Sequence, residues 1–204
     1  IIEDCAQSHG AKLNNLIAGS IGEVAAWSFY PTKNLGSISD SGCITTNSKK
    51  IQKKIQMLRD YGQSSKYKHD IIGYNSRMSE LHGGILILKL NSLKKNIKKR
   101  ISVSLLYNKE IRNRKIKILN CIFDGSHVYH QFVILVKNRN QFIKYMNNKG
   151  IQSIIHYPTP LFKQKASKKY LLSKKSDYNA ITFTKSCVSI PCHEYLNKDD
   201  INHI

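Results

Sequence analysis

The sequence has few prolines, few acidic residues and no long hydrophobic run. Its 204 residues include 4 Pro and 13 Asp and Glu, against 33 Lys and Arg. A membrane-spanning helix needs roughly 18 or more apolar residues, whereas the longest candidate, residues 83–88, is interrupted by Lys89. The composition, with 41% hydrophobic and 23% charged residues, is typical of a folded globular protein. We therefore expect an ordered protein without a membrane segment.

Paired cysteines are lacking as well. The five cysteines are an odd number at irregular spacings, with no CxxC pair and no Cys/His cluster that has the spacing of a zinc site. The sequence therefore predicts no metal site, and reduced thiols in a cytoplasmic protein are the simplest interpretation. The cysteines are Cys5, Cys43, Cys121, Cys187 and Cys192.

The shortage of acidic residues leaves a formal net charge of +20. Binding of nucleic acid is one interpretation of this charge, and a general preference for Lys, Asn and Ile along the chain is another. The lysines are spread out, and the densest run, residues 94–100, falls on a predicted helix as its solvated face. Clustered cations interleaved with aromatic side chains are missing. We predict no nucleic-acid partner, while attraction of an anionic substrate remains consistent with the charge.

The chain starts with Ile1-Ile2-Glu3-Asp4, which has neither an initiator Met nor the profile of a signal peptide. We interpret this segment as a buried strand whose earlier residues are absent. The end, residues 201–204, falls inside a predicted helix. We therefore expect that the N-terminal part of the first domain is absent from this chain.

The first third of the sequence alternates short apolar segments with turns. Strands are predicted over residues 1–6, 24–29 and 42–46, and Ser48 is predicted to cap a helix that runs to about residue 61. Alternation of strands and helices of this kind is typical of α/β organisation.

A long helix is predicted from about residue 79 to about residue 112. The pair Gly83-Gly84 inside it costs about 1 kcal/mol per glycine relative to alanine, so we expect it to mark close packing or a kink. The helix is predicted to link a domain over residues 1–80 to a smaller domain over residues 113–204, with residues 81–112 as the link.

The remainder reads as a small α+β unit. A strand is predicted over residues 130–136, a helix over residues 140–149 and a second strand over residues 151–156. Gly150 is a good C-terminal stop for the helix between them.

Three residues near two predicted strand ends have the chemistry that pyridoxal phosphate requires. Asp4 ends the first strand, Ser28 ends the second, and Lys33 follows five residues after Ser28. Taken singly, Asp4 reads as a helix cap or surface turn and Lys33 as a loop lysine. Together they supply a carboxylate for the ring nitrogen, a hydroxyl for the phosphate and an amine for the covalent bond.

At these residues the sequence resembles the DegT/DnrJ/EryC1/StrS family of sugar aminotransferases, over essentially the whole chain. The order and spacing of three motifs carry the resemblance. They are Glu3-Asp4-x-Ala6-Gln7-x-x-Gly10-Ala11, Ser28-Phe29-x-x-x-Lys33-Asn34-Leu35-Gly36 and Gly73-Tyr74-Asn75-Ser76-Arg77-Met78.

The resemblance implies a role for five residues. Lys33 matches the lysine that binds pyridoxal 5'-phosphate covalently and is the catalytic residue, and Asp4 matches the partner of the ring nitrogen. Gln7 matches the residue near the ring hydroxyl, and Ser28 matches a phosphate ligand. Asn75 matches a phosphate ligand that reaches across a dimer interface, so the resemblance implies a homodimer with shared active sites.

The implied fold is α/β: the rear part of the large domain of a fold type I pyridoxal-phosphate-dependent aminotransferase, a long linking helix and a smaller α+β C-terminal domain. The N-terminal half of the family holds a phosphate-binding turn and an aromatic that stacks on the cofactor. This chain has neither, so we expect it to be inactive alone.

The sequence departs from the family pattern at two places. Ser39 and Ser41 stand where the family has glycines, and serine there adds strain if the position requires a positive φ. The segment His82-Gly83-Gly84 stands where the family has Gln-Ala-Ala. Both changes are expected to affect activity and stability, and neither argues against the resemblance to the family.

The resemblance implies transfer of an amino group from L-glutamate to a nucleotide-linked keto-sugar in deoxyamino-sugar or surface polysaccharide biosynthesis. Residues 75–77 and 155–158 look more like enzymes that aminate a dTDP- or UDP-linked 3-keto sugar. His156 and Tyr157 are the predicted substrate-binding residues, with packing at a strand end as the alternative. Lys33 argues against the dehydratases of the family, which have His there. A 4-keto-sugar aminotransferase and an inactive remnant with a structural role remain as alternatives.

Overall fold

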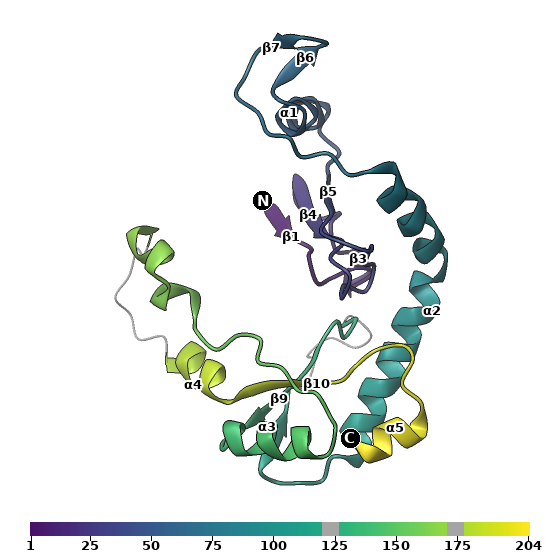
Figure 1. The fold of residues 1–204 in the computed structure, drawn as a ribbon, viewed down its shortest axis with the longest axis vertical. Coiled ribbons are helices and arrows are strands. Elements are labelled where there is room, and N and C mark those ends of the chain that lie inside the picture. Colours follow the sequence, from purple (N-terminus) through teal and green to yellow (C-terminus); the bar gives the residue numbers. More distant parts are fainter. Residues whose placement is uncertain (120–126, 171–177) are drawn as a thin grey trace. The chain divides into compact units, whose positions relative to one another are not determined.

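The computed structural model describes residues 1–119, 127–170 and 178–204 (Figure 1). The chain divides into two compact units. The described residues of the first unit are 1–98 and 127–130, and the remaining described residues form the second unit. The long helix α2 (Glu80–Glu110) contributes residues to both units. None of the helices in the described residues has the length and hydrophobicity needed to cross a membrane.

The first unit contains a three-stranded mixed sheet in the order β1-β4-β5 (Figure 1). β1 and β4 are parallel, and β5 is antiparallel to β4. This confirms the three strands predicted from the sequence, each shorter than predicted. A two-stranded ribbon, β2 with β3, lies between β1 and β4 in the sequence. The bounds are β1 Ile2–Asp4, β2 Lys12–Leu13, β3 Leu16–Ile17, β4 Val24–Ser28 and β5 Gly42–Thr45.

Helix α1 (Lys49–Arg59) begins where the sequence predicts it. The Ser48 hydroxyl accepts a hydrogen bond from the backbone N–H of Ile51 at 3.4 Å, which satisfies one of the free donors of the first turn. The helix is followed by a hairpin of β6 (Gln63–Ser65) and β7 (Lys68–His69).

The core of the first unit joins the sheet to α2. Phe29, Leu35 and Leu86 are buried together, and Trp27 and Leu93 pack against them. Burial of each large apolar side chain contributes about 1.5–3 kcal/mol. Leu86 and Leu93 are seven residues apart on α2, so they lie on one face of the helix.

The glycine pair in α2 does not mark close packing. A Cβ at Gly83 or Gly84 would meet nothing within 4 Å among the described residues. Of the two expected roles, close packing is therefore wrong among the described residues, and a kink at this pair stays a prediction.

The second unit contains an antiparallel three-stranded sheet in the order β10-β9-β8. All four residues of β10 are buried, and β9 alternates between buried and partly buried residues. The predicted strand over residues 151–156 is wrong: Ile154 forms only an isolated bridge with Ser189. The bounds are β8 Ile116–Ile118, β9 Phe132–Val136, β10 Cys187–Ile190, α3 Arg139–Asn148, α4 Tyr178–Ser186 and α5 Lys198–His203, with two 3-10 helices, Leu161–Lys163 and Lys165–Tyr170.

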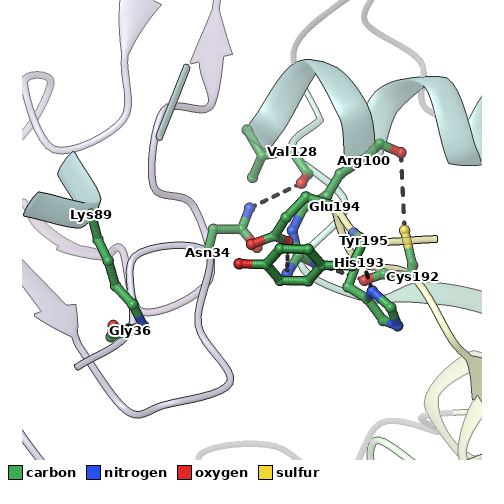
Figure 2. A network of polar contacts seen from close by, with 9 residues as sticks. All are labelled: Asn34, Gly36, Lys89, Arg100, Val128, Cys192, His193, Glu194 and Tyr195. Carbon is green, nitrogen blue, oxygen red and sulfur yellow. Dashed lines mark hydrogen bonds and ion pairs between the residues drawn. The ribbon is translucent and has the colours of Figure 1, made fainter. Parts of the chain in front are cut away.

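A buried ion pair fixes the segment after β10 against α2 within the second unit (Figure 2). The Arg100 guanidinium lies 2.9 Å from the Glu194 carboxylate and donates a hydrogen bond to the Cys192 carbonyl at 2.7 Å. About two turns further along α2, the Tyr107 hydroxyl donates to the Pro191 carbonyl at 2.7 Å. Three polar contacts, to Pro191, Cys192 and Glu194, therefore hold this segment.

Candidate active site

Two of the predicted site residues lie at the same edge of the first sheet. In the parallel pairing of β1 with β4, Asp4 stands opposite Ala26, and Ser28 ends β4 two residues later. Ligands of α/β sheets bind at the carboxyl ends of parallel strands. The Asp4 side chain is exposed, and one of its oxygens accepts a hydrogen bond from the Ala6 backbone at 3.0 Å. Its other oxygen has no hydrogen bond among the described residues.

The neighbouring carboxylate, Glu3, has a structural role. Its two oxygens accept hydrogen bonds from the backbone N–H groups of Gly19, Ile21 and Gly22 at 2.7–2.8 Å. These donors, first that of Gly22, hold the pKa of Glu3 below its ordinary value. Glu3 thus closes the loop between β3 and β4, which leaves Asp4 as the carboxylate of this pair that is available to a ligand.

The segment that carries Lys33 is a tightly closed loop. Phe29 donates to the Ser41 carbonyl and accepts from the backbone of Ser37, both at 2.7 Å. Within the loop, the Lys33 backbone donates to the Tyr30 carbonyl at 2.9 Å. A Cβ at Gly36 would lie 2.5 Å from the Pro31 carbonyl oxygen, so only glycine fits there without movement of the backbone. The loop therefore gives Lys33 a defined backbone position.

Two side chains fix this loop to the rest of the first unit (Figure 2). Lys89 of α2 donates to the Gly36 carbonyl at 2.6 Å. The Asn34 amide donates to the carbonyl of Val128 at 3.0 Å. Asn34 and Gly36 of the lysine motif therefore have structural roles beside Lys33.

A buried histidine that the sequence analysis did not single out lies beside the loop. His9 is only 3% exposed, and its ring contacts those of Trp27 and Phe29 at centroid distances of 5.1 and 5.9 Å. Burial, and then the charge of Lys33, lower its pKa to about 4, so the ring is neutral at pH 7. Neither ring nitrogen has a hydrogen-bond partner among the described residues.

The residues present fit pyridoxal phosphate. Buried polar atoms in proteins are nearly always paired, so unpaired ones indicate a missing ligand, water or segment. Several unpaired buried atoms lie in the lysine loop or in the turn after β1: both His9 nitrogens, the Asn34 carbonyl oxygen and the Ser37 hydroxyl. Lys33, Asp4 and Ser28 provide the amine, carboxylate and hydroxyl that the group requires. Gln7 is exposed in the turn after β1, where the structure gives it no partner among the described residues.

Asn75 lies on a rigid support next to the hairpin. It is exposed and forms an isolated bridge with Asp60. A Cβ at Gly73 would lie 2.1 Å from the backbone nitrogen of Gly62, which explains the glycine of this motif. No contact among the described residues joins Asn75 to Lys33. The role of Asn75 across a dimer stays a prediction.

The two predicted substrate residues belong to the second unit. His156 Nδ1 lies 2.8 Å from the Ser189 hydroxyl, and its ring meets that of Tyr157 edge-on at 5.3 Å. The Tyr157 side chain is exposed. His156 is thus packed against β10, while Tyr157 is free to contact a ligand.

Two further expectations concern the serines at positions 39 and 41 and the cysteines. Neither Ser39 nor Ser41 has a positive φ, so the condition under which these serines would add strain is not met. The four cysteines that the structure describes are free thiols, as predicted, and burial raises the pKa of each. The fifth, Cys121, lies outside the described residues.

A family model matches residues 1–204, the whole chain. Its description is the DegT/DnrJ/EryC1/StrS aminotransferase family.

Curated relatives match over the full chain but only part of their own length. The chain is 37% identical over 204 residues to the dTDP-3-amino-3,6-dideoxy-alpha-D-galactopyranose transaminase of Aneurinibacillus thermoaerophilus. It is 31% identical to the UDP-2-acetamido-2-deoxy-3-oxo-D-glucuronate aminotransferase of Pseudomonas aeruginosa. Each match covers 100% of this chain and 56% of the relative. The chain therefore spans about half the length of these relatives.

Solved structures agree in fold. DesV of S. venezuelae, crystallised with a ketimine intermediate, superposes with a TM-score of 0.91 at 30% identity. The match covers 99% of this chain and 55% of DesV. The predicted fold, the rear part of an aminotransferase of this kind, is confirmed.

Proposed function

Because the chain belongs to the DegT/DnrJ/EryC1/StrS aminotransferase family, we propose that it is part of a pyridoxal-phosphate-dependent aminotransferase acting on a nucleotide-linked keto-sugar. The observation that carries the proposal is the sheet edge at which Asp4 and Ser28 end parallel strands, followed by the closed loop of Lys33. We use "complete protein" for this chain preceded by an N-terminal half of the kind that its relatives have. The proposed activity is that of the complete protein.

Each site residue has a proposed task. When bound, pyridoxal phosphate supplies an electrophilic carbon for the covalent bond and a ring that accepts an electron pair. Lys33 would hold the group covalently through its Nζ, and its amine, once free, would act first as the base and then as the acid of the proton transfer at the donor α-carbon. The Asp4 carboxylate would keep the ring nitrogen protonated. Ser28 would donate a hydrogen bond to the phosphate, and Gln7 would serve the ring hydroxyl.

The proposed substrate is a dTDP- or UDP-linked 3-keto sugar, with L-glutamate as the donor. The names of two relatives support this choice, because both place the reacting nitrogen or keto group at position 3 of the sugar. The exposed ring of Tyr157 and the neighbouring His156 are the proposed contacts to this substrate. A 4-keto sugar is the second candidate, and surface polysaccharide biosynthesis is the proposed pathway class.

The complete protein is proposed to be a homodimer in which Asn75 serves the partner's cofactor site. The exposure of Asn75 on a rigid turn supports this arrangement. Mixing a Lys33→Ala subunit with an Asn75→Ala subunit tests it. Mixed dimers should regain activity, because one of their two sites is intact, and a confirmed mixed dimer without activity would contradict a shared site.

The direct test of function separates the two half-reactions. The complete protein, loaded with pyridoxal phosphate, should release 2-oxoglutarate from L-glutamate and then aminate a 3-keto nucleotide sugar faster than a 4-keto one. Lys33→Ala should do neither. Release without sugar amination would leave the substrate assignment wrong, and failure to bind the cofactor would favour the structural remnant.

A further inference from the structure

A basic groove lies between α1 and the hairpin of β6 and β7, within the first unit. Its volume is about 820 Å³. From α1 it takes Lys53, Gln56 and Met57, which follow the spacing of a single helix face, and Asp60 follows as the residue that ends the helix. The residues of the hairpin from Gln63 to Tyr67 form the opposite wall. No task in the proposed transamination uses this groove.

The two walls are held together by the backbone. Gly62 donates to the Met57 carbonyl at 2.8 Å, and Tyr74 donates to that of Leu58 at 2.7 Å. A Cβ at Gly62 would lie 1.7 Å from the Ile71 carbonyl oxygen, so the backbones of Gly62 and Ile71 pack together with no room for a side chain at residue 62. The groove is therefore a fixed feature of α1 and the hairpin, formed before any ligand arrives.

The charge of the groove favours an anion with more than one negative charge. It is lined by one carboxylate, that of Asp60, and by four cations: Lys53, Arg59, Lys66 and Arg77. The Arg77 guanidinium lies 3.4 Å from Asp60 and is stacked over the Tyr61 ring at 5.1 Å. This arrangement orients a planar donor that binds phosphate in a bidentate manner.

An exposed aromatic stands beside the cations. Tyr67 is 81% exposed, and the Lys66 ammonium lies 5.1 Å from the centre of its ring. Tyr67 has a φ of 66°, a conformation that glycine or asparagine adopts more easily. Its backbone N–H donates to the Gln63 side chain at 2.9 Å, which holds the turn. Strained residues of this kind are found at ligand sites.

We propose that this groove binds the nucleoside diphosphate part of a nucleotide-linked substrate. The diphosphate lies on the cations of α1 and Arg77, and the base stacks on Tyr67. The assignment rests on the proposed function for the presence of such a substrate, but it concerns residues that are separate in sequence from the Lys33 motif. Diphosphate and base together explain why cations and an exposed ring occur in one groove.

The test measures binding of dTDP and UDP to the 204-residue chain by calorimetry, with no pyridoxal phosphate present. Circular dichroism confirms the fold of each variant. Lys53→Ala should raise the dissociation constant about fivefold, and added salt should weaken binding to the original chain. Lys54→Ala is the matched control, because the next residue of α1 does not line the groove, and it should change the constant less than about twofold. Equal effects of the two substitutions would overturn the proposal, since they would indicate unspecific attraction to a basic surface.

Tyr67→Asn tests the base contact without strain, because asparagine tolerates a positive φ. The variant should be at least as stable as the original chain and bind dTDP about fivefold more weakly, while its affinity for inorganic pyrophosphate stays the same. If dTDP and pyrophosphate bind equally well to the original chain, the groove takes an anion only and the nucleoside assignment is wrong. Because the cofactor is left out, failure here is distinct from a failure of Lys33 to react.

Discussion

Asp4 and Ser28 end neighbouring parallel strands at one edge of the same sheet, while Glu3, one residue earlier, is occupied by three backbone donors. In the first motif, Glu3 therefore stabilises the fold, and Asp4 stays available to a ligand. This division and four other features of the structure each lead to a prediction that can be measured.

The first prediction separates the two carboxylates. Glu3→Gln should lower the melting temperature and speed hydrogen exchange at Gly19, Ile21 and Gly22, because an amide oxygen accepts more weakly than a carboxylate. Asp4→Asn should leave both unchanged, yet slow proton abstraction in the complete protein by about 100-fold or more. An Asp4→Asn chain that unfolds as readily as the Glu3 variant would contradict the division.

The second prediction concerns the buried histidine. The pKa of His9 is lowered from 6.5 to about 4, so between these values the unfolded chain binds a proton that the folded chain excludes. Stability therefore falls as the pH is lowered from 6.5 towards 4. Relative to His9→Phe, the original chain should lose about 2–3 kcal/mol more between pH 7 and pH 4.5. Urea unfolding of both chains at the two pH values measures this difference, and equal losses would show that His9 is not held neutral.

The third prediction compares two glycines. Gly62 has a φ of 74° and lies against the Ile71 carbonyl, so Gly62→Ala should destabilise the chain by about 2–4 kcal/mol. Gly84 lies in α2 with nothing within 4 Å of a Cβ, so Gly84→Ala should stabilise it by about 0.5–1 kcal/mol. Chemical denaturation distinguishes these opposite signs. A loss of stability in Gly84→Ala would mean that the glycine has a packing role in the chain that these contacts miss.

The fourth prediction concerns the Arg100–Glu194 pair. Its side chains are 8% and 13% exposed, so Glu194→Gln removes a carboxylate that pairs with a buried arginine and should cost about 3 kcal/mol. The pair of Lys109 with Glu110 serves as the control, because both side chains are more than half exposed. Glu110→Gln should cost less than about 0.5 kcal/mol. Similar costs for the two variants, measured by urea unfolding, would contradict a buried role for Arg100.

Much of the fold follows from local patterns in the sequence. The Ser48 cap and the apolar spacing of α1 predicted that helix, and turn residues bounded β1, β4 and β5. The strand expected over residues 151–156 failed because its pairing depends on a distant partner. Ile154 meets Ser189 at one position only, and no local pattern specifies how far a ladder extends.

The candidate site shows the same limit. The residue types of Asp4, Ser28 and Lys33 indicated cofactor chemistry, but no role was predicted for Glu3, because its donors come from a loop 16–19 residues away. His9 was missed for a similar reason. One signal was present: Trp27 and Phe29 are two residues apart, so they share a face that a neighbouring segment must cover. The convergence of Lys33 with Asp4 on one cofactor stays a prediction.

The most direct test of the account is the identity of the lysine that binds the cofactor. The complete protein is loaded with pyridoxal 5'-phosphate, reduced with borohydride and mapped by peptide mass spectrometry, with Lys33→Ala and Lys89→Ala as paired variants. We expect a phosphopyridoxyl group on Lys33 in the original protein and in Lys89→Ala, and none in Lys33→Ala. A label on any other lysine, or no label at saturating cofactor, would contradict the assignment of Lys33 as the catalytic residue.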